Sequence, residues 1–190
     1  MRNLDDFHFV AKKMANFAVN LRKTTYRAWQ SINPIKIYTM KSVFDAADVA
    51  ELIARIQTLT PQTPAKWGKM QVAQMLAHCC VSYEMIFEPS KHPKPNFILG
   101  FILRTFVKKL VVNDQPFKQN ERTAPAFIIA DSKNFEEEKA RLIAYLQQTL
   151  QLGTAYFDNK ESHSFGPLTK TEWNNMLYKH LAHHLAQFGV

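Results

Sequence analysis

The sequence predicts an all-α fold, an antiparallel four-helix bundle with a long crossover between its second and third helices and an N-terminal helical extension. Apolar residues recur at helical spacing in four segments of the chain, and charged residues lie between them. Nine prolines fall mostly between these segments, where they do not interrupt a helix. The hydrophobic content of 46% supports a packed core and excludes a disordered chain. Four helices joined by one long crossover are typical of an antiparallel bundle.

Residues 1–39 differ in charge from the rest of the chain. They hold seven Lys and Arg against two Asp, a net +5 out of the chain's +8. Three interpretations are open for this basic amphipathic extension: a helix docked on the domain, an amphipathic helix on a surface or membrane, or sequence upstream of a true start at Met40. The bundle domain is expected in residues 40–190. That domain offers no basic face with aromatic support, so we expect no nucleic-acid partner.

Cysteine content and hydropathy indicate the compartment. The chain has two cysteines, the adjacent Cys79 and Cys80, which excludes a disulfide scaffold and favours a reducing environment. The most apolar stretch, Phe97–Val112, is interrupted by three basic residues and is too short for a membrane helix. We therefore expect a soluble, cytoplasmic protein without a transmembrane segment.

The first two core helices are predicted from apolar spacing. The first should begin near Asp45, a plausible N-cap, with an apolar stripe formed by Val49, Leu52, Ile53, Ile56 and Leu59. The second should run from about Met70 to Phe87. The crossover that follows should contain helix within Phe97–Val112 and then an extended loop over Gln115–Asp131, with a short strand around Phe127–Ile129.

The last two core helices have clear end signals. The third is expected over about Phe135–Leu150, with three glutamates in its first turn and Gly153 closing it. The fourth should start at the capping box of Thr169 and Glu172 and end by Gly189.

Two histidines of the fourth helix suggest a metal site. His180 and His184 are one turn apart on the stripe that faces the core, a common spacing for two metal-binding imidazoles. The alternative is a pair of partly exposed histidines near a helix C-terminus, where His also suits the helix dipole. His183 should point away from this face. No Glu directly follows His180, so the zinc-protease pattern is absent.

A third ligand would have to come from another helix. His78 lies in the middle of the second helix among apolar and small residues, where a lone His is more often a satisfied core residue. Across an antiparallel bundle it would complete a site of three histidines with an open position. Cys79 and Cys80 are rival ligands, but they diverge from His78 around the helix and are expected in the core. His8 and His92 lie in segments that look peripheral and receive no role.

Several short motifs carry a resemblance to a known family. They are the segments Trp67–Met70, Gln74–His78, Ser164–Thr169, Glu172–Trp173 and His180–Gly189. In this order and separation they resemble the DinB/YfiT-like superfamily of metalloenzymes, within an uncharacterised bacterial branch. The resemblance covers about residues 40–190 and does not extend to residues 1–39.

The resemblance implies a four-helix bundle that holds a divalent ion on one His of helix two and two of helix four, here His78, His180 and His184. Relatives in the wider superfamily include transferases and isomerases that use low-molecular-weight thiols. We therefore expect activation of a water or such a thiol for attack on a small electrophilic substrate, as in a hydrolase or thiol transferase. The ion could be Zn, Ni or Fe, since imidazole binds each of them.

Other residues could assist at this site. Gln187, one turn beyond His184, could orient a ligand or substrate, although a cap or core hydrogen bond is the commoner role. His163, in the loop before the fourth helix, could serve as a proton shuttle, or could be an ordinary loop histidine. Glu84 and Tyr83 are the nearest further candidates on the second helix.

A non-catalytic role is the main alternative. In that interpretation the helical bundle binds a structural ion, a ligand or a partner, and a closed fourth coordination position would favour it. An exposed apolar patch over Phe97–Val112 would favour a homodimer. A pocket that opens onto the three histidines would instead favour an enzyme.

Overall fold

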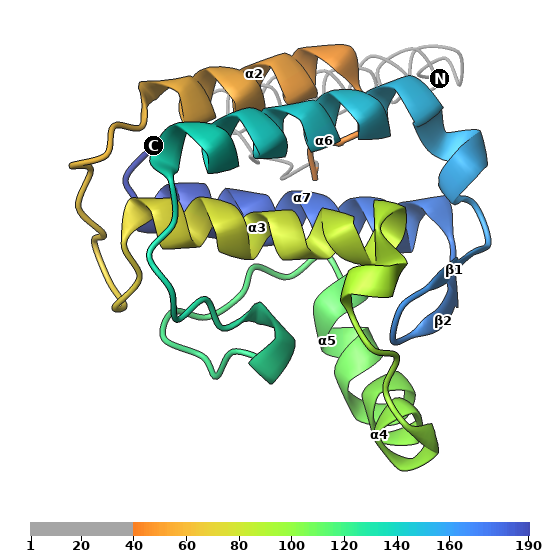
Figure 1. Ribbon diagram of the computed structural model, residues 1–190. Helices are drawn as coiled ribbons and strands as arrows, with labels where there is room; N and C mark the ends of the chain where they lie inside the picture. The colour runs from red at the N-terminus through yellow and green to blue at the C-terminus, as the bar shows by residue number, and fades with distance from the viewer. Residues whose placement is uncertain (1–39) are drawn as a thin grey trace, which may run out of the picture. The chain divides into compact units, whose positions relative to one another are not determined.

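The computed structural model describes residues 40–190. The predicted extension over residues 1–39 lies outside the described residues, so its three interpretations remain predictions. The described part is mostly helical, with a small two-stranded antiparallel sheet between the last two long helices (Figure 1). The all-α expectation is therefore confirmed in its main part, and the sheet is an addition to it.

The elements follow one another in a simple order. The long helices are α2 (Ala46–Thr58), α3 (Val72–Phe87), α6 (Phe135–Phe157) and α7 (Lys170–Gln187). The crossover between α3 and α6 contains the short helices α4 (Phe97–Ile102) and α5 (Lys108–Val112), with the π-helical turn η2 (Leu103–Val107) between them. Two 3₁₀ turns, η1 (Pro89–Lys91) and η3 (Pro125–Phe127), and the strands β1 (Lys160–Ser162) and β2 (Gly166–Leu168) complete the described chain.

The helix starts are stabilised by side chains that cap free backbone N–H groups. The Asp45 carboxylate accepts hydrogen bonds from two N–H groups at the start of α2, which confirms the predicted N-cap. At α7 the predicted capping box is present, because Thr169 accepts from the Glu172 N–H and the Glu172 carboxylate accepts from the Thr169 N–H. The Asn134 side chain caps α6 as Asp45 caps α2, by accepting hydrogen bonds from backbone N–H groups at the start of the helix.

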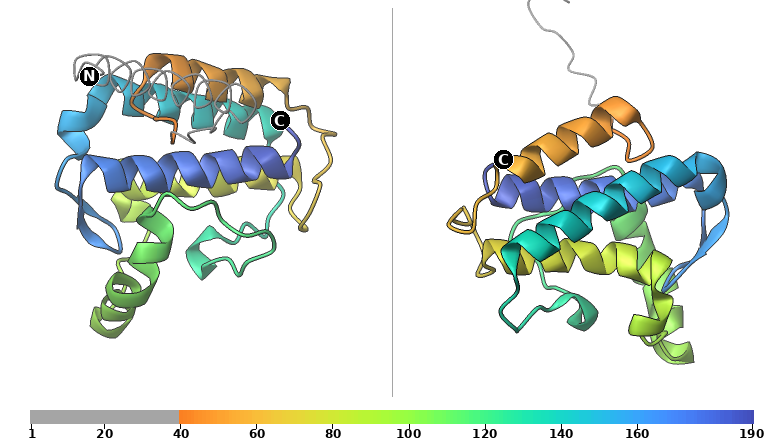
Figure 2. Two further views of the ribbon diagram at one scale, coloured as in Figure 1. Left: turned by 180° about the vertical axis from the view of Figure 1, so that it is seen from behind. Right: turned by 45° about the horizontal axis from the view of Figure 1, so that its top comes forward.

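The four long helices pack around a shared core. Helix α6 contacts α2, α3 and α7, and α7 also contacts α2 and α3 (Figures 1 and 2). Helix α3 is buried on most of its circumference, as its apolar sequence predicts. The largest fully buried side chains come from all four helices and from the hairpin: Trp173, Tyr83, Phe157, Leu52, Ile56, Leu59, Met75, Leu76, Leu142, Leu146, Leu168 and Leu177.

Helix α6 is longer than the sequence predicts. It continues to Phe157 instead of ending near Leu150, and Gly153 does not close it but sits at a kink with φ 65° and ψ 179°. Gly tolerates this left-handed φ without steric cost, so the chain can bend there and resume the helix. The extra turn buries Phe157 against Phe44 and Trp173, which stabilises the continuation.

The segment 115–168 also differs from the prediction in two places. The prediction of a short strand around Phe127–Ile129 is wrong, because Phe127 is the last residue of the 3₁₀ turn η3 and the segment pairs with no strand. A hairpin absent from the prediction pairs Lys160 with Leu168 and Ser162 with Gly166. Its strands of three residues are too short to show a period-two pattern. The hairpin connects α6 to the start of α7, the helix that carries two of the candidate ligands.

Candidate metal centre

Three histidines converge between α3 and α7. His78 of α3 and His180 and His184 of α7 each offer a ring nitrogen, and these three atoms all lie within 4.8 Å of one another. His78 and His184 are buried, with exposed fractions of 4% and 8%, whereas His180 is partly exposed. The structure thus brings together the three residues that the sequence analysis selected, and they could hold a metal ion.

Two of the three rings are held through Nδ1 by partners that can only accept. His78 Nδ1 lies 2.8 Å from the carbonyl oxygen of Phe127, and His184 Nδ1 lies 2.8 Å from Oε1 of Gln187. Both oxygens accept hydrogen bonds, so Nδ1 of each neutral ring carries the proton. Nε2 of each ring is therefore left with a free lone pair, the form in which an imidazole binds a metal.

The third ring makes a contact that requires a shared proton or a cation. His180 Nε2 lies 2.9 Å from His78 Nε2, and His180 Nδ1 lies 3.0 Å from the Ser82 hydroxyl. Because His78 Nε2 carries no proton, it can only accept, and His180 Nε2 must donate a hydrogen bond to it in the metal-free protein. The Ser82 hydroxyl then donates to His180 Nδ1. If the two rings held one ion through Nε2, the His180 proton would lie on Nδ1 and Ser82 would accept it. A hydroxyl suits both states because it can donate or accept.

Gln187 is held in a single orientation by the chain before α3. Its Nε2 donates to the carbonyl oxygen of Trp67 at 2.8 Å, which directs Oε1 to His184. Gly68 makes this approach possible: its φ is +82°, and a Cβ at this position would lie 2.6 Å from Gln187 Nε2. The Trp67-Gly68 pair therefore seats the side chain that orients His184.

Burial keeps the cluster uncharged. Burial lowers the pKa of His78, and the Phe127 carbonyl offsets part of this effect. Burial, together with the neighbouring His78, lowers the pKa of His184 to about 3. Burial and the other two imidazoles lower the pKa of His180 well below its usual value. Near neutral pH all three rings are therefore neutral, with lone pairs available to a cation.

The three nitrogen donors suit a divalent ion that is intermediate between hard and soft. Three neutral imidazole nitrogens are typical ligands of Zn, Ni, Fe or Cu, and three protein ligands leave a coordination position open for a further molecule. The cluster contains no carboxylate or thiolate, so the charge of a bound cation would stay uncompensated.

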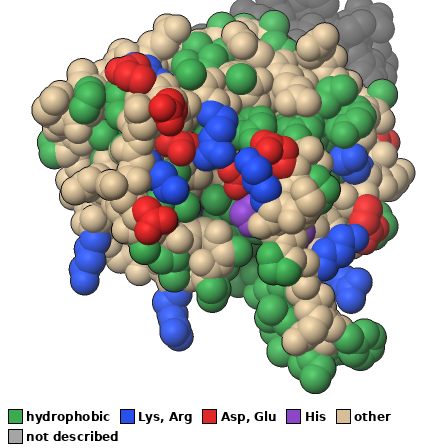
Figure 3. All heavy atoms as spheres, in the orientation of Figure 1, with side chains coloured by type: hydrophobic (Ala, Val, Ile, Leu, Met, Phe, Trp, Pro, Cys, Tyr) green, Lys and Arg blue, Asp and Glu red, His purple; other side chains and the backbone are tan. Residues whose placement is uncertain are grey.

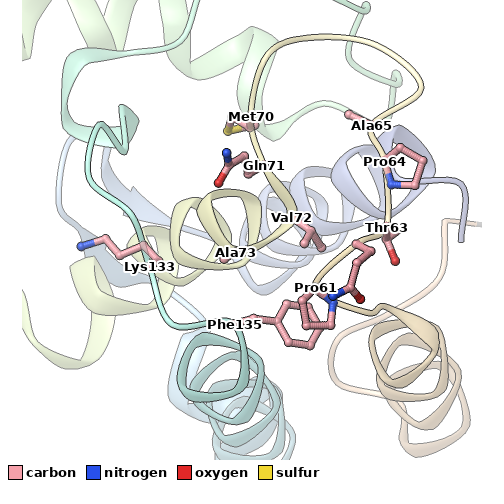
Figure 4. Close-up of a pocket in the computed structure, with 11 residues that line it drawn as sticks. Pro61, Thr63, Pro64, Ala65, Met70, Gln71, Val72, Ala73, Lys133 and Phe135 are labelled. Atoms are coloured by element: carbon pink, nitrogen blue, oxygen red, sulfur yellow. The ribbon is translucent and has the colours of Figure 1, made fainter.

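A cavity of about 500 Å³ lies at the N-terminal ends of α3 and α6 (Figure 4). Its walls come from the α2–α3 loop, the start of α3, and the residues Lys133 and Phe135 before and at the start of α6. None of the three histidines lines it, so this cavity does not open onto the candidate metal centre.

The other predicted site residue, His163, lies in the turn between β1 and β2. Its Nδ1 contacts the Ser164 hydroxyl at 2.9 Å, and its Nε2 contacts the carbonyl oxygen of His92 at 3.2 Å. No contact with the three histidines is present in residues 40–190. The role of His163 as a proton shuttle remains a prediction.

The remaining candidates on α3 have structural contacts. Cys79 and Cys80 are free, buried thiols, and burial raises the pKa of Cys80 to about 12, so both behave as core residues. Glu84 accepts from His92 and forms an ion pair with Arg141. Tyr83 stacks on Tyr145 in the core, with ring centroids 5.6 Å apart.

Sequence reasoning missed three groups that orient the cluster. They are the Ser82 hydroxyl and the backbone carbonyls of Phe127 and Trp67. Phe127 also places its ring 5.5 Å from that of His78 and 5.7 Å from that of His180. The spacing of Ser82, four residues after His78, was a usable signal for one of them. A backbone carbonyl leaves no signal in side-chain patterns.

Gln187→Leu tests whether the hydrogen bond between Gln187 and His184 matters for metal binding. We expect the affinity for Zn²⁺ to fall by about 10- to 100-fold with the fold retained, because His184 loses the acceptor that fixes its Nδ1 proton. Isothermal titration calorimetry measures the affinity. Gln151→Leu, the same change at an exposed position of α6, is the control and should bind Zn²⁺ like the parent. Equal affinity in both variants would show that Gln187 does not orient the ligand.

Comparison with known proteins gives a family and no function. No curated protein and no solved structure matches the chain. A family model described as "Protein of unknown function (DUF1569)" matches residues 39–189, which include all three histidines and the elements that orient them. Because this match spans most of the sequence, the chain belongs to the DUF1569 family of proteins of unknown function.

Proposed function

We propose that residues 40–190 form a DinB/YfiT-like four-helix bundle that acts as a metal-dependent enzyme. In this proposal His78, His180 and His184 hold one divalent ion, and the reaction is attack of a water or low-molecular-weight thiol on a small electrophilic substrate. The observation that carries it is the arrangement of the three imidazoles. Each has its Nδ1 engaged by an outer partner, and a shift of the His180 proton from Nε2 to Nδ1 would direct all three Nε2 lone pairs to one ion.

A divalent ion bound there supplies Lewis acidity, which lowers the pKa of a water or thiol and stabilises the resulting nucleophile. The chain's own residues hold and orient the three ligands. Phe127, Ser82 and Gln187 fix the rings, so little reorganisation is needed when the ion binds. The Phe127 ring beside His78 and His180 gives the centre an apolar edge that limits access of bulk water.

Gln187 fits a positioning role better than a catalytic one. Its amide oxygen contacts His184 and its amide nitrogen donates to Trp67, so both of its polar atoms are already engaged. His163 is proposed as a proton shuttle on its imidazole chemistry alone. The small-molecule substrate, the thiol and the cytoplasmic location belong to this same proposal.

A non-catalytic ion is the second candidate, and the burial of the cluster favours it. His78 and His184 are almost fully enclosed, as the ligands of a structural ion usually are. The two functions differ in the fourth coordination position, which a catalytic ion keeps open and a structural ion fills with protein.

The enzymatic proposal is tested with protein purified without a nickel column and loaded separately with Zn²⁺, Ni²⁺ or Fe²⁺. A panel of electrophilic thiol acceptors with a low-molecular-weight thiol, and of esters and lactones with water, provides the substrates. We expect turnover of at least one class that a chelator abolishes and the ion restores. His180→Leu should be inactive with every ion. Turnover that is indifferent to chelator and to His180→Leu would contradict metal-dependent catalysis.

A further inference from the structure

The crossover carries a helical arm that extends away from the packed helices. This apolar arm consists of residues 97–112, namely α4, η2 and α5, and it projects from the body beside the hairpin in every view (Figures 1 and 2). Its base is anchored, because Val112 is buried and Lys179 of α7 donates to the carbonyl oxygens of Leu110 and Asn113. The arm is therefore a fixed part of the fold.

Large apolar side chains are exposed along most of the length of the arm. Within residues 40–190, seven of the ten exposed large hydrophobic residues lie on it: Phe97, Ile98, Leu99, Phe101, Ile102, Phe106 and Leu110. At its free end Phe97 is 83% exposed and Ile98 is 71% exposed. Figure 3 shows hydrophobic side chains gathered on this projection. Such an exposed apolar surface is typical of an interaction site, so some partner should cover the arm.

The charged residues of the arm itself and of the segment directly before it are all positive. Residues 89–113 contain five Lys and Arg and no Asp or Glu. Lys94 and Lys109 are exposed and have no ion pair within the described part of the chain, whereas Lys108 pairs with Glu172. Exposed cations next to exposed aromatic and aliphatic side chains complement a surface that is anionic outside and apolar beneath.

We propose that the apolar arm docks on the surface of a membrane that contains anionic lipids. Phe97, Ile98 and Phe101 enter the boundary between headgroups and acyl chains, and Lys94 and Lys109 contact lipid phosphates. The arm lies in the interface and does not cross the membrane: 16 helical residues extend about 24 Å, less than the roughly 30 Å of a hydrocarbon core. No helix in residues 40–190 is long and apolar enough to span one.

The arm fits a lipid surface better than a second copy of the chain. Two copies joined through their arms would bring together Lys94 and Lys109 of each copy, which have no ion pair in residues 40–190, and like charges oppose such contact. The arm is also a projection and not a groove (Figures 1 and 2), and its exposed apolar residues can therefore enter a fluid interface. The test must therefore distinguish a homodimer formed through the arm from binding of the arm to a membrane.

The test is co-sedimentation of the full chain with vesicles of phosphatidylcholine, with and without 30% phosphatidylglycerol. The arm variant Phe97→Ser/Ile98→Ser is compared with Tyr156→Ser/Ile128→Ser, which removes one exposed aromatic and one exposed isoleucine elsewhere. We expect the parent and the control to bind the anionic vesicles, with weaker binding at high salt. The arm variant should partition at least about tenfold less.

The outcomes distinguish binding through the arm from binding through another part of the chain. Full binding by the arm variant would overturn the proposal, because cations elsewhere, including residues 1–39, would then suffice. Equal loss of binding in both variants would also overturn it, since the effect would not be specific to the arm. Sedimentation velocity without lipid supplies the last criterion: a parent dimer that the arm variant converts to monomer would assign the arm to self-association. Circular dichroism of each variant verifies that the fold is retained.

Discussion

Replacing His184 by Leu should nearly abolish metal binding. The parent is expected to bind about one divalent ion per chain, with three imidazoles as ligands. In His184→Leu two ligands remain, and we expect the affinity for the metal ion to fall more than about 100-fold. This loss is larger than the one expected for Gln187→Leu, which removes only a hydrogen bond to a ligand. The measurement is elemental analysis after dialysis against excess Zn²⁺ and then buffer. His78→Leu should behave in the same way, because the two rings come from different helices yet share one ion.

The control uses the same substitution at a histidine outside the cluster. His163→Leu should retain the parent's metal content, since His163 contacts Ser164 and His92 and none of the three ligands. Circular dichroism and thermal melting of all variants establish that loss of metal is not loss of fold. Stoichiometric metal in both His78→Leu and His184→Leu would exclude the assignment of the ligands.

Acid should destabilise the metal-free protein well above the range in which carboxylates titrate. Burial lowers the pKa values of His78, His180 and His184 in the folded state, whereas an unfolded chain has histidine pKa values near 6.5. The unfolded state therefore binds more protons as the pH falls below about 6.5, and the free energy of unfolding decreases. For each histidine that stays neutral on folding, the loss between pH 7.5 and 5.5 is about 1.4 kcal/mol.

Urea unfolding of chelator-treated protein at pH 7.5 and pH 5.5 measures this difference. The full stability is present above the unfolded-state pKa, and the His184 contribution declines until the pH reaches its folded-state pKa of about 3. In His184→Leu the difference between the two pH values should be smaller by about 1.4 kcal/mol. Identical free energies of unfolding at both pH values in the parent would contradict a buried neutral cluster.

The sequence predicted the positions of the long helices because each is rich in apolar residues, and because α2, α6 and α7 also carry a start signal. Asp45 and the capping box at Thr169 were both located correctly. The end of α6 was wrong, because Gly153 can terminate a helix or kink it, and the choice depends on whether Phe157 finds a place in the core. The hairpin is held by pairing across the chain and by Ser162, which bonds Gly166 and Phe165, and not by residue periodicity.

Helical spacing placed His180 and His184 on one face, whereas the choice of His78 as the third ligand rested mainly on the family resemblance. The outer contacts of the cluster were harder to foresee. Gln187 was recognised as a neighbour of the cluster, but its contact with the Trp67 carbonyl depends on the path of a loop with a positive φ at Gly68. The Phe127 carbonyl comes from the long crossover, 49 residues away from His78 in sequence. Such contacts are fixed by tertiary structure alone.

X-ray absorption at the zinc edge of the reconstituted full chain tests the central claim most directly, because it reports on the atoms that surround the ion. We predict three imidazole nitrogens at about 2.0–2.1 Å, with the outer-shell scattering of the rings and one further light atom. Sulfur scattering at about 2.3 Å, or a spectrum with fewer imidazoles, would show that the ion is held elsewhere. Either result would contradict a metal centre built from His78, His180 and His184.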